Sequence, residues 1–364
     1  MRVTPPVEIT TLKLTSSTAA EPHDPAAYSA GTTCGFGAIV KVAADFKIYE
    51  SLLPANTGNT PSINPIWWRA LGPTEATYNA ATTYALGDTV SSSTSHRIYE
   101  SLAADNVGNP LPVLPETATA KWLDVGPTNR YSMFDLSRNS QTVCPSPLTV
   151  VIAPGERINS LGLAGLSANQ VQISATSVMG GGTVYPNVNS ASATGIFDLN
   201  TRIVNDGYDY AFEPFTTLPS MAIFDLPAFS DIIVTVTITA GSGNVKCGAL
   251  VVGTYIYIGD IQYGVTSDGM NFSTVTRDVW GNATLVPRRT IPKTDQTLII
   301  SADRINRCKE ARELLNALPA LWTGIDDNTS SWFDMLAILG IYTQFRIGAV
   351  NNSRAEINLS LEEI

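Results

Sequence analysis

Two pairs of aspartates are the residues of this chain whose spacing could support acid–base or metal chemistry. Asp206 and Asp209 lie in the stretch NDGYD. Asp326 and Asp327 lie in the stretch GIDDNT. A glycosidase needs two carboxyl groups across a cleft, and calcium prefers clustered oxygen ligands. Both pairs stand in turn-rich sequence, where aspartate is common because it bonds nearby backbone amides, so we predict no catalytic residue and no metal site.

Other residue types that perform chemistry are sparse. His23 lies in a proline-rich linker and His96 in a Ser/Thr-rich turn, and neither belongs to a motif that activates a nucleophile. No GxSxG, HExxH or P-loop sequence occurs. The cysteines form no CxxC or CxxH pair, which predicts buried free thiols and leaves a disulfide between distant positions open. They are Cys34, Cys144, Cys247 and Cys308. We therefore expect no enzyme and no cofactor.

The composition restricts the partners. The 364 residues include 22 basic and 32 acidic side chains, so the net charge is −10, and only 15% of residues are charged. An acidic chain without a Lys/Arg cluster is a poor candidate for binding nucleic acid. The N-terminal stretch MRVTPPVEITTLKLTSS has no apolar core, and no apolar run is long enough for a membrane helix. We expect neither a signal peptide nor membrane insertion.

One phrase occurs twice in the chain. IYESLLPANTGNTP begins at Ile48 and IYESLAADNVGNP begins at Ile98, an offset of 50 residues. The preceding residues 26–40 and 76–90 align at the same offset, and after a four-residue insertion Trp68 aligns with Trp122. So many identities in one register indicate a tandem duplication of a module of about 50 residues.

The sequence of each module predicts a few short strands and a shallow core. Because so small a unit cannot bury much aliphatic surface, large aromatic residues such as Trp68 and Trp122 are expected to supply the core. The repeated Asn-x-Gly-Asn phrase predicts a turn in which Gly58 and Gly108 adopt positive φ. Hydrogen bonding of its asparagines to a glycan is the alternative.

The second module resembles the small chitin-binding modules of bacterial chitinases. The similarity rests on Tyr84-Ala-Leu-Gly-Asp88-Thr-Val, the following Ile98-Tyr-Glu-Ser and the closing Trp122; in the first module Cys34 and Ala38 replace Tyr84 and Asp88. In such modules exposed aromatic faces stack on sugar rings. The resemblance therefore implies a carbohydrate site formed by the aromatic residues of both modules, which are Tyr28, Tyr49, Trp67, Trp68, Tyr78, Tyr84, Tyr99 and Trp122.

The remaining residues predict a β-sandwich and a mixed C-terminal segment. IIVTVTIT (232–239) alternates, VKCGALVVGTYIYIG (245–259) predicts a strand pair, and residues 148–166 and 169–185 predict two hairpins. DRINRCKEARELLNALP (303–319) predicts an amphipathic helix, and RAEINLSLEE (354–363) a strand paired with 336–347. We expect a mainly β fold: an extension (1–24), two modules (25–74 and 75–128), a jelly-roll-like β-sandwich (129–290) and a C-terminal helix with a strand pair (291–364).

Several phrases resemble, in order, a family of tailed-bacteriophage virion proteins. They include LPAFSDIIVTVT, VKCGALVVGTYIYIGDIQYGV, VTRDVWGNATLVPRR, LPALWTG and ILGIYTQFRI. Such proteins carry one or two chitin-binding-like modules before a jelly-roll sandwich. The resemblance implies a structural protein of the tail tip or baseplate in the virion. Its expected partners are other tail proteins, further copies in a ring or trimer, and host-surface polysaccharide.

A different class of function stays open at this point. The duplicated modules would also suit a free carbohydrate-binding protein, or the binding part of a glycan hydrolase. A spacer or docking role for the modules competes with sugar binding as well.

Overall fold

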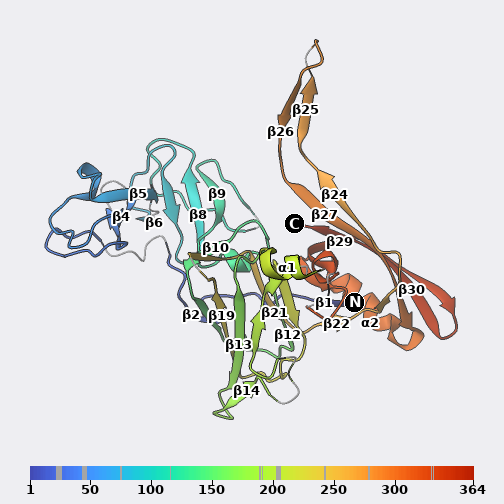
Figure 1. The fold of residues 1–364 in the computed structure, drawn as a ribbon. Helices are drawn as coiled ribbons and strands as arrows, with labels where there is room; N and C mark the ends of the chain where they lie inside the picture. The colour runs from blue at the N-terminus through green and yellow to red at the C-terminus, as the bar shows by residue number, and fades with distance from the viewer. Residues whose placement is uncertain are drawn as a thin grey trace. The chain divides into compact units, whose positions relative to one another are not determined.

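The chain forms two compact units in a computed structural model (Figure 1). The smaller unit comprises Ala19–Ser132, and the larger combines Met1–Thr18 with Met133–Ile364. The regular structure of the chain is mainly antiparallel β-sheet, which confirms the predicted mainly β fold. The structure describes residues 1–21, 27–42, 47–73, 76–114, 116–187, 190, 192–201, 206–241, 243–277, 279–328, 330 and 332–364.

The smaller unit contains the two predicted modules, and each is built around a small β-sheet. In the first module the strand order is β3-β4-β5, and in the second it is β6-β7-β8-β9. The first consists of β3 (Ile39–Val42), β4 (Lys47–Ser51), η1 (Pro61–Ile63) and β5 (Trp68–Pro73). The second consists of β6 (Ala76–Thr77), β7 (Thr89–Ser91), β8 (Arg97–Ser101) and β9 (Trp122–Pro127).

The duplication extends to the strand register. Val40 lies opposite Tyr49 in the first module, and Val90 lies opposite Tyr99 in the second. In both, the pairing shifts by one residue directly before that tyrosine. Equal sequences therefore fold into equal sheets, with the same irregularity at the same place.

The larger unit contains the predicted β-sandwich. Its larger sheet has the order β14-β13-β19-β11-β2, with β15 on β13. The residues Ile232, Val234, Val236 and Ile238 of β19 are buried, as the alternation predicts, and the residues between them are half-buried. The strands are β2 (Leu14–Ser17), β11 (Leu148–Ile152), β13 (Gln170–Ser177), β14 (Thr183–Tyr185), β15 (Ile196–Asp198) and β19 (Ile232–Thr239).

A smaller sheet of order β18-β12-β21 is buried on both faces. One face packs through Ala164, Ala222 and Val251 against Leu321 and Leu339 of the C-terminal segment. Gly162 allows this approach, because a Cβ there would lie 1.9 Å from a methyl carbon of Leu321. The strands are β12 (Ser160–Ala164), β18 (Ser220–Ile223) and β21 (Ala249–Gly253); β10 (Thr142–Pro145) and β20 (Asn244–Cys247) form a separate pair.

The C-terminal residues form an eight-stranded sheet together with the N-terminus. Its order is β22-β1-β28-β29-β30-β27-β23, and β24 also pairs with β27. The predicted pairing of the last strand is confirmed, since β30 runs antiparallel to β29 from Gly340↔Glu363 to Asn351↔Arg354. The strands are β1 (Arg2–Thr4), β22 (Ile256–Tyr257), β23 (Asp260–Ile261), β24 (Thr266–Asn271), β27 (Thr290–Ser301), β28 (Ala320–Thr323), β29 (Ala337–Asn351) and β30 (Arg354–Glu363).

The predicted amphipathic helix covers this sheet. It is α2 (Ile305–Leu314), preceded by η3 (Ala302–Arg304). Its Cys308 and Ala311 share a core with the sheet residues Trp322, Ile357 and Leu359. Two further short helices are η2 (Ser132–Phe134) and α3 (Phe333–Leu336). Among the described residues, no helix is long and apolar enough to cross a membrane.

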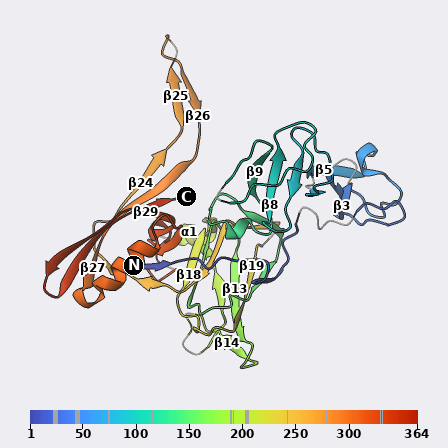
Figure 2. The same cartoon turned by 180° about the vertical axis from the view of Figure 1, so that it is seen from behind.

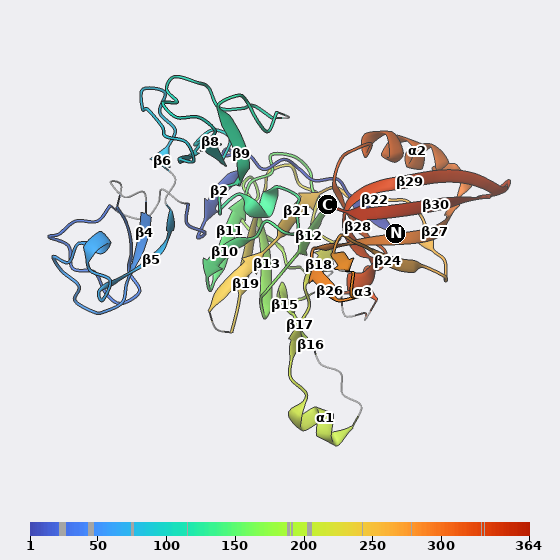
Figure 3. The same ribbon diagram turned by 90° about the horizontal axis from the view of Figure 1, so that it is seen from above.

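Two segments project from the larger unit. Between β24 and β27 the chain continues as a two-stranded arm, β25 (Thr274–Arg277) with β26 (Ala283–Val286), drawn in orange in Figures 1 and 2. Between β15 and β18 it makes an excursion through β16 (Asn200–Thr201), α1 (Gly207–Phe212) and β17 (Thr216–Thr217). Figure 3 shows α1 at the far end of this excursion.

Four predictions differ from the structure. Residues 256–271, predicted within the β-sandwich (129–290), form β22, β23 and β24 of the eight-stranded sheet. Residues 1–18, predicted as part of an N-terminal extension, contribute β1 and β2 to sheets of the larger unit. The predicted hairpin of 148–166 does not form, because β11 pairs with β19 and β2 whereas β12 pairs with β18 and β21. Likewise β20 and β21 pair with β10 and β12 rather than with each other. The hairpin of 169–185 is confirmed by the β13–β14 pairing.

Candidate interaction surfaces

The repeated Asn-x-Gly-Asn phrase builds a buried hydrogen-bond network in each module. In the second module Asn106 donates to Ser101 Oγ at 3.0 Å and to the carbonyl oxygen of Lys121 at 3.1 Å. Asn109 donates to Asn106 Oδ1 at 2.8 Å, and Trp122 Nε1 donates to the carbonyl oxygen of Asn109 at 3.0 Å. These bonds tie the turn to the closing tryptophan.

The first module repeats the network residue for residue. Asn56 donates to Ser51 Oγ at 3.0 Å, Asn59 donates to Asn56 Oδ1 at 2.9 Å, and Trp68 Nε1 donates to the carbonyl oxygen of Asn59 at 2.7 Å. Gly58 has φ 77° and Gly108 has φ 70°, which confirms the predicted turn. Asn56 and Asn106 are buried, so their side chains are occupied inside the modules rather than presented to a glycan.

The aromatic residues predicted as a carbohydrate site are mainly core residues. Five of the eight are buried and three are half-buried. The buried ones are Tyr49, Trp68, Tyr84, Tyr99 and Trp122, and the half-buried ones are Tyr28, Trp67 and Tyr78. They pack on one another and on Val40 or Val90. A buried ring cannot stack on a sugar. The eight rings therefore do not form one sugar-stacking face.

The two modules differ at the positions where the sequences differ. Tyr78 lies edge-on to Trp122 with ring centroids 5.8 Å apart, and its hydroxyl donates to the carbonyl oxygen of Asn109 at 2.7 Å. Tyr28 lies edge-on to Trp68 at 5.9 Å, but its buried hydroxyl has no hydrogen-bond partner in the described part of the chain. The first module therefore keeps the aromatic packing with a less complete polar network.

The exposed apolar residues of the modules are not the aromatic residues that were predicted to form a carbohydrate site. Phe36 and Leu86, at equivalent positions before a turn glycine, are both exposed. Further exposed apolar residues are Ile63 and Ile66 in the first module and Val113 and Leu114 in the second. Isolated apolar residues on a surface are ordinary. Exposed apolar residues at the same turn of both modules, however, favour a contact surface.

The aspartate pairs have structural partners. Asp206 caps α1, because its Oδ1 accepts hydrogen bonds from the amides of Tyr208 at 2.8 Å and Asp209 at 3.0 Å. Asp326 forms an ion pair with Arg2 at 2.7 Å. The carbonyl oxygen of Asp327 accepts from the amide of Ser330 at 3.2 Å. In the described ranges, no group of three or more His, Cys, Asp or Glu is placed to hold a metal ion.

The histidine that the structure describes and the four cysteines also have structural environments. The His96 ring stacks on Tyr131 with centroids 3.8 Å apart, while His23 lies outside the described residues. All four cysteines are free and buried, as predicted. Burial raises the pKa of Cys247 to about 12 and raises the pKa values of Cys144 and Cys308. Such thiols are protonated at neutral pH and therefore poor nucleophiles.

The α1 excursion exposes a cluster of aromatic rings. Tyr208, Tyr210 and Phe212 of α1 and the following Phe215 are all exposed. Tyr208 and Phe212 contact each other with ring centroids 4.8 Å apart. Exposed aromatic residues so close together are typical of a surface that binds another molecule.

The arm is a second exposed apolar element of the larger unit. Every residue of β25 and β26 is exposed, and Val275 lies opposite Leu285 on one face of the ribbon. At the tip, Val279 is 89% exposed and Trp280 is 84% exposed. The segment reads VTRDVWGNATLV, in which strand-type residues flank a Gly-Asn turn, and this pattern could have revealed a hairpin. It could not have revealed that the hairpin stands away from the core.

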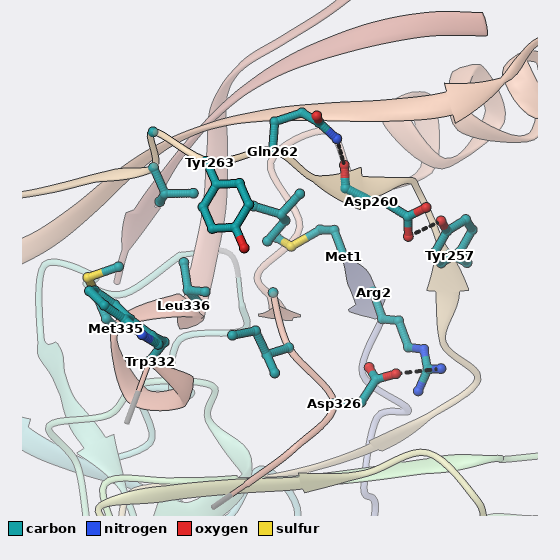
Figure 4. A pocket seen from close by; sticks show the side chains of 15 residues that line it. Met1, Arg2, Tyr257, Asp260, Gln262, Tyr263, Asp326, Trp332, Met335 and Leu336 are labelled. Carbon is teal, nitrogen blue, oxygen red and sulfur yellow. Dashed lines mark hydrogen bonds and ion pairs between the residues drawn. The ribbon is translucent and has the colours of Figure 1, made fainter. Parts of the chain in front are cut away.

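A pocket of about 570 Å³ lies next to the start of β24 (Figure 4). Its wall includes Tyr263 and Val265, directly before β24, and Met335 and Leu336 of the C-terminal segment. The exposed Trp332 stands at its edge. Arg2 is paired with Asp326, and Tyr257 donates a hydrogen bond to Asp260, as the dashed lines in Figure 4 mark. The lining is therefore largely apolar, with its main charged groups already paired.

The sequence matches no protein-family model, and a comparison with curated protein sequences gives no match either.

Proposed function

We propose that this chain is a structural subunit of a bacteriophage tail, at the tail tip or baseplate, that assembles with other tail proteins and with copies of itself. The observation that carries the proposal is the arm of β25 and β26 with its exposed Val279–Trp280 tip. A two-stranded hairpin is at best marginally stable in water, so an arm of this kind is typical of an element that a neighbouring subunit covers. The ordered sequence resemblance supports the tail as the place of assembly.

The modules fit the same proposal as docking or spacer units. Their hydrogen-bond networks and aromatic cores make each module a self-contained unit, and the equivalent Phe36 and Leu86 are exposed. In an assembled tail these apolar positions would contact neighbouring proteins. Host contact through the modules would then depend on the residues that remain accessible, such as Trp67.

Purified particles test the proposal. Phage particles from the producing strain would be banded on a density gradient and their proteins quantified by mass spectrometry. We expect peptides of this chain in the particle band at a constant ratio to a major tail protein. A chain found only in the soluble fraction of the lysate would contradict the proposal and favour a free carbohydrate-binding protein or the binding part of a glycan hydrolase.

Carbohydrate contact is a second candidate function, favoured by the exposed rings of α1. Tyr208 and Phe212 offer aromatic faces to solvent, and sugar rings stack on such faces. Retention of the full chain on immobilised host polysaccharide or chitin would be compared for the wild type, Tyr208→Ala and Trp67→Ala. Loss of retention in one variant would locate the contact on α1 or on the first module. No retention of the wild type would leave docking as the role of both surfaces.

A further inference from the structure

Two arginine side chains line a second cavity of the larger unit, which has a volume of about 390 Å³. They are Arg304, at the end of η3, and Arg307, in the first turn of α2. Both are exposed, and neither forms an ion pair with a residue that the structure describes. The guanidinium of Arg304 lies 5.4 Å from the ring centroid of Tyr257, which also lines the cavity. An arginine without a carboxylate partner keeps its N–H donors available for a ligand.

A third donor in the lining is the side-chain amide of Asn159. Its Oδ1 accepts a hydrogen bond from the backbone amide of Tyr255 at 2.9 Å, so its Nδ2 is the end that remains available. Among the described residues, Nδ2 has no acceptor. The hydroxyl of Tyr257 already donates to Asp260. The lining therefore offers unused N–H donors on three side chains, and the described residues that form it include no carboxylate.

The carboxylates closest in the chain leave the two arginines unpaired. Asp303 directly precedes Arg304, and Glu310 lies one turn further along α2, but in the described part of the chain neither forms an ion pair with either arginine. Asp303 and Asp260 line a neighbouring cavity, in which Arg354 is a further cation. Because salt screens exposed charges over short distances, the groups of the lining itself decide which ligand is attracted. These groups favour an anion.

The donors and the size of the cavity favour a phosphate ester among anions. Guanidinium groups bind phosphate oxygens through paired N–H donors. A phosphate has enough oxygens to accept from both arginines and from Asn159 at once, whereas a carboxylate has only two. A volume of about 390 Å³ exceeds that of a phosphate group and lies in the range of small-molecule sites. Tyr255 and Tyr257 add ring surface for an organic part of the ligand.

We propose that this cavity binds a phosphate group carried by a small organic residue, as in glycerol phosphate. Arg304 and Arg307 hold the phosphate oxygens, and Nδ2 of Asn159 donates a further hydrogen bond. The rings of Tyr255 and Tyr257 contact the organic part. This site goes beyond the proposed function and does not depend on it.

Isothermal titration calorimetry of the purified full chain with glycerol phosphate tests the proposal. We expect saturable binding by the wild type. Arg304→Gln and Arg307→Gln should each weaken binding about ten-fold, because each removes hydrogen bonds between charged groups. Lys309→Gln is the matched control, since it removes an exposed cation of the same helix that does not line the cavity. It should bind like the wild type.

Inorganic phosphate and glycerol are the comparison ligands. Inorganic phosphate should bind more weakly than glycerol phosphate, and glycerol should not bind at the same concentration. Absence of glycerol phosphate binding, equal binding by Arg307→Gln and the wild type, or an equal loss in Lys309→Gln would each overturn the proposal. Inorganic phosphate that binds as tightly as the ester would overturn the contact with an organic part. The titration contains no phage particles, so its failure is distinguishable from a failure of the particle test.

Discussion

The indole of Trp122 donates its Nε1 hydrogen to the carbonyl oxygen of Asn109 at 3.0 Å, and the pair closes the second module. Trp68 and Asn59 repeat this bond in the first module at 2.7 Å. The two residues belong to the two most recognisable parts of the repeat, the closing tryptophan and the Asn-x-Gly-Asn phrase. Their contact explains why both parts recur together: each needs the other to complete the module.

Trp122→Ala should destabilise the second module. Trp122 is fully buried, and loss of a buried tryptophan costs about 3–5 kcal/mol. Amide hydrogen exchange of the full chain should therefore rise across β6 to β9, while the sheets of the larger unit keep their protection. The exposed neighbour Leu123→Ala should leave exchange nearly unchanged. Unaltered protection in Trp122→Ala would contradict a core role for this residue.

Asn106→Ala should also weaken the second module, because it removes both donors and the acceptor of a buried network. Buried polar groups left without partners cost about 1–3 kcal/mol each, so we expect a loss of about 3 kcal/mol in thermal or denaturant unfolding of the module. Val107→Thr is the matched control, since the first module carries Thr57 at this position. It should change stability by about 0.5 kcal/mol or less. Equal effects of the two substitutions would disprove a special role of the asparagine.

Gly340→Ala should disrupt the junction of β29 and β30. A Cβ at Gly340 would lie 1.9 Å from the carbonyl oxygen of Glu362, and a backbone atom of a central strand cannot move away freely. We expect a loss of about 3 kcal/mol or more in the unfolding free energy of the larger unit. Gly348→Ala, in the same strand, would bring its Cβ no closer than 3.9 Å to Glu356 and should be nearly neutral. A neutral Gly340→Ala would contradict this packing.

Asp231 should stabilise the larger unit at neutral pH but not at acidic pH. Its carboxylate accepts hydrogen bonds from Ser177 Oγ at 2.6 Å and from the amide of Met179 at 2.8 Å, which lower the pKa of Asp231. A lowered folded pKa means that the stabilisation is present above the ordinary aspartate pKa near 4 and is lost as the pH falls through the folded value. The melting temperatures of the wild type and Asp231→Asn should therefore differ at pH 6 and converge towards pH 3. A constant difference would exclude this linkage.

Local sequence pattern predicted those elements whose partners are close in the chain. The strict alternation of 354–363 identified β30 and its pairing with the preceding strand, and the offset of 50 residues identified the modules. The pairing of β11 and β12 was wrong because apolar strands of two sheets look alike in sequence, and a sandwich joins strands far apart in the chain. The short β1 and β2 lacked a pattern long enough to distinguish them from an extension.

Prediction of the candidate site from the sequence was limited in the same way. The expectation that Trp68 and Trp122 supply the cores of the modules is confirmed, but the sequence did not show which of the other aromatic residues face inward, and Tyr99 is buried as well. The arm around Trp280 was visible as a set of strand-type residues, yet its exposure depends on the absence of a covering element in three dimensions. Exposure of this kind becomes apparent only once the sheets are assembled.

Immunogold electron microscopy of particles from the producing strain, with an antibody against residues 78–128, tests the central claim most directly. Gold at the tail tip or baseplate is the result that the proposed function predicts. Unlabelled particles together with the protein free in the lysate would contradict it.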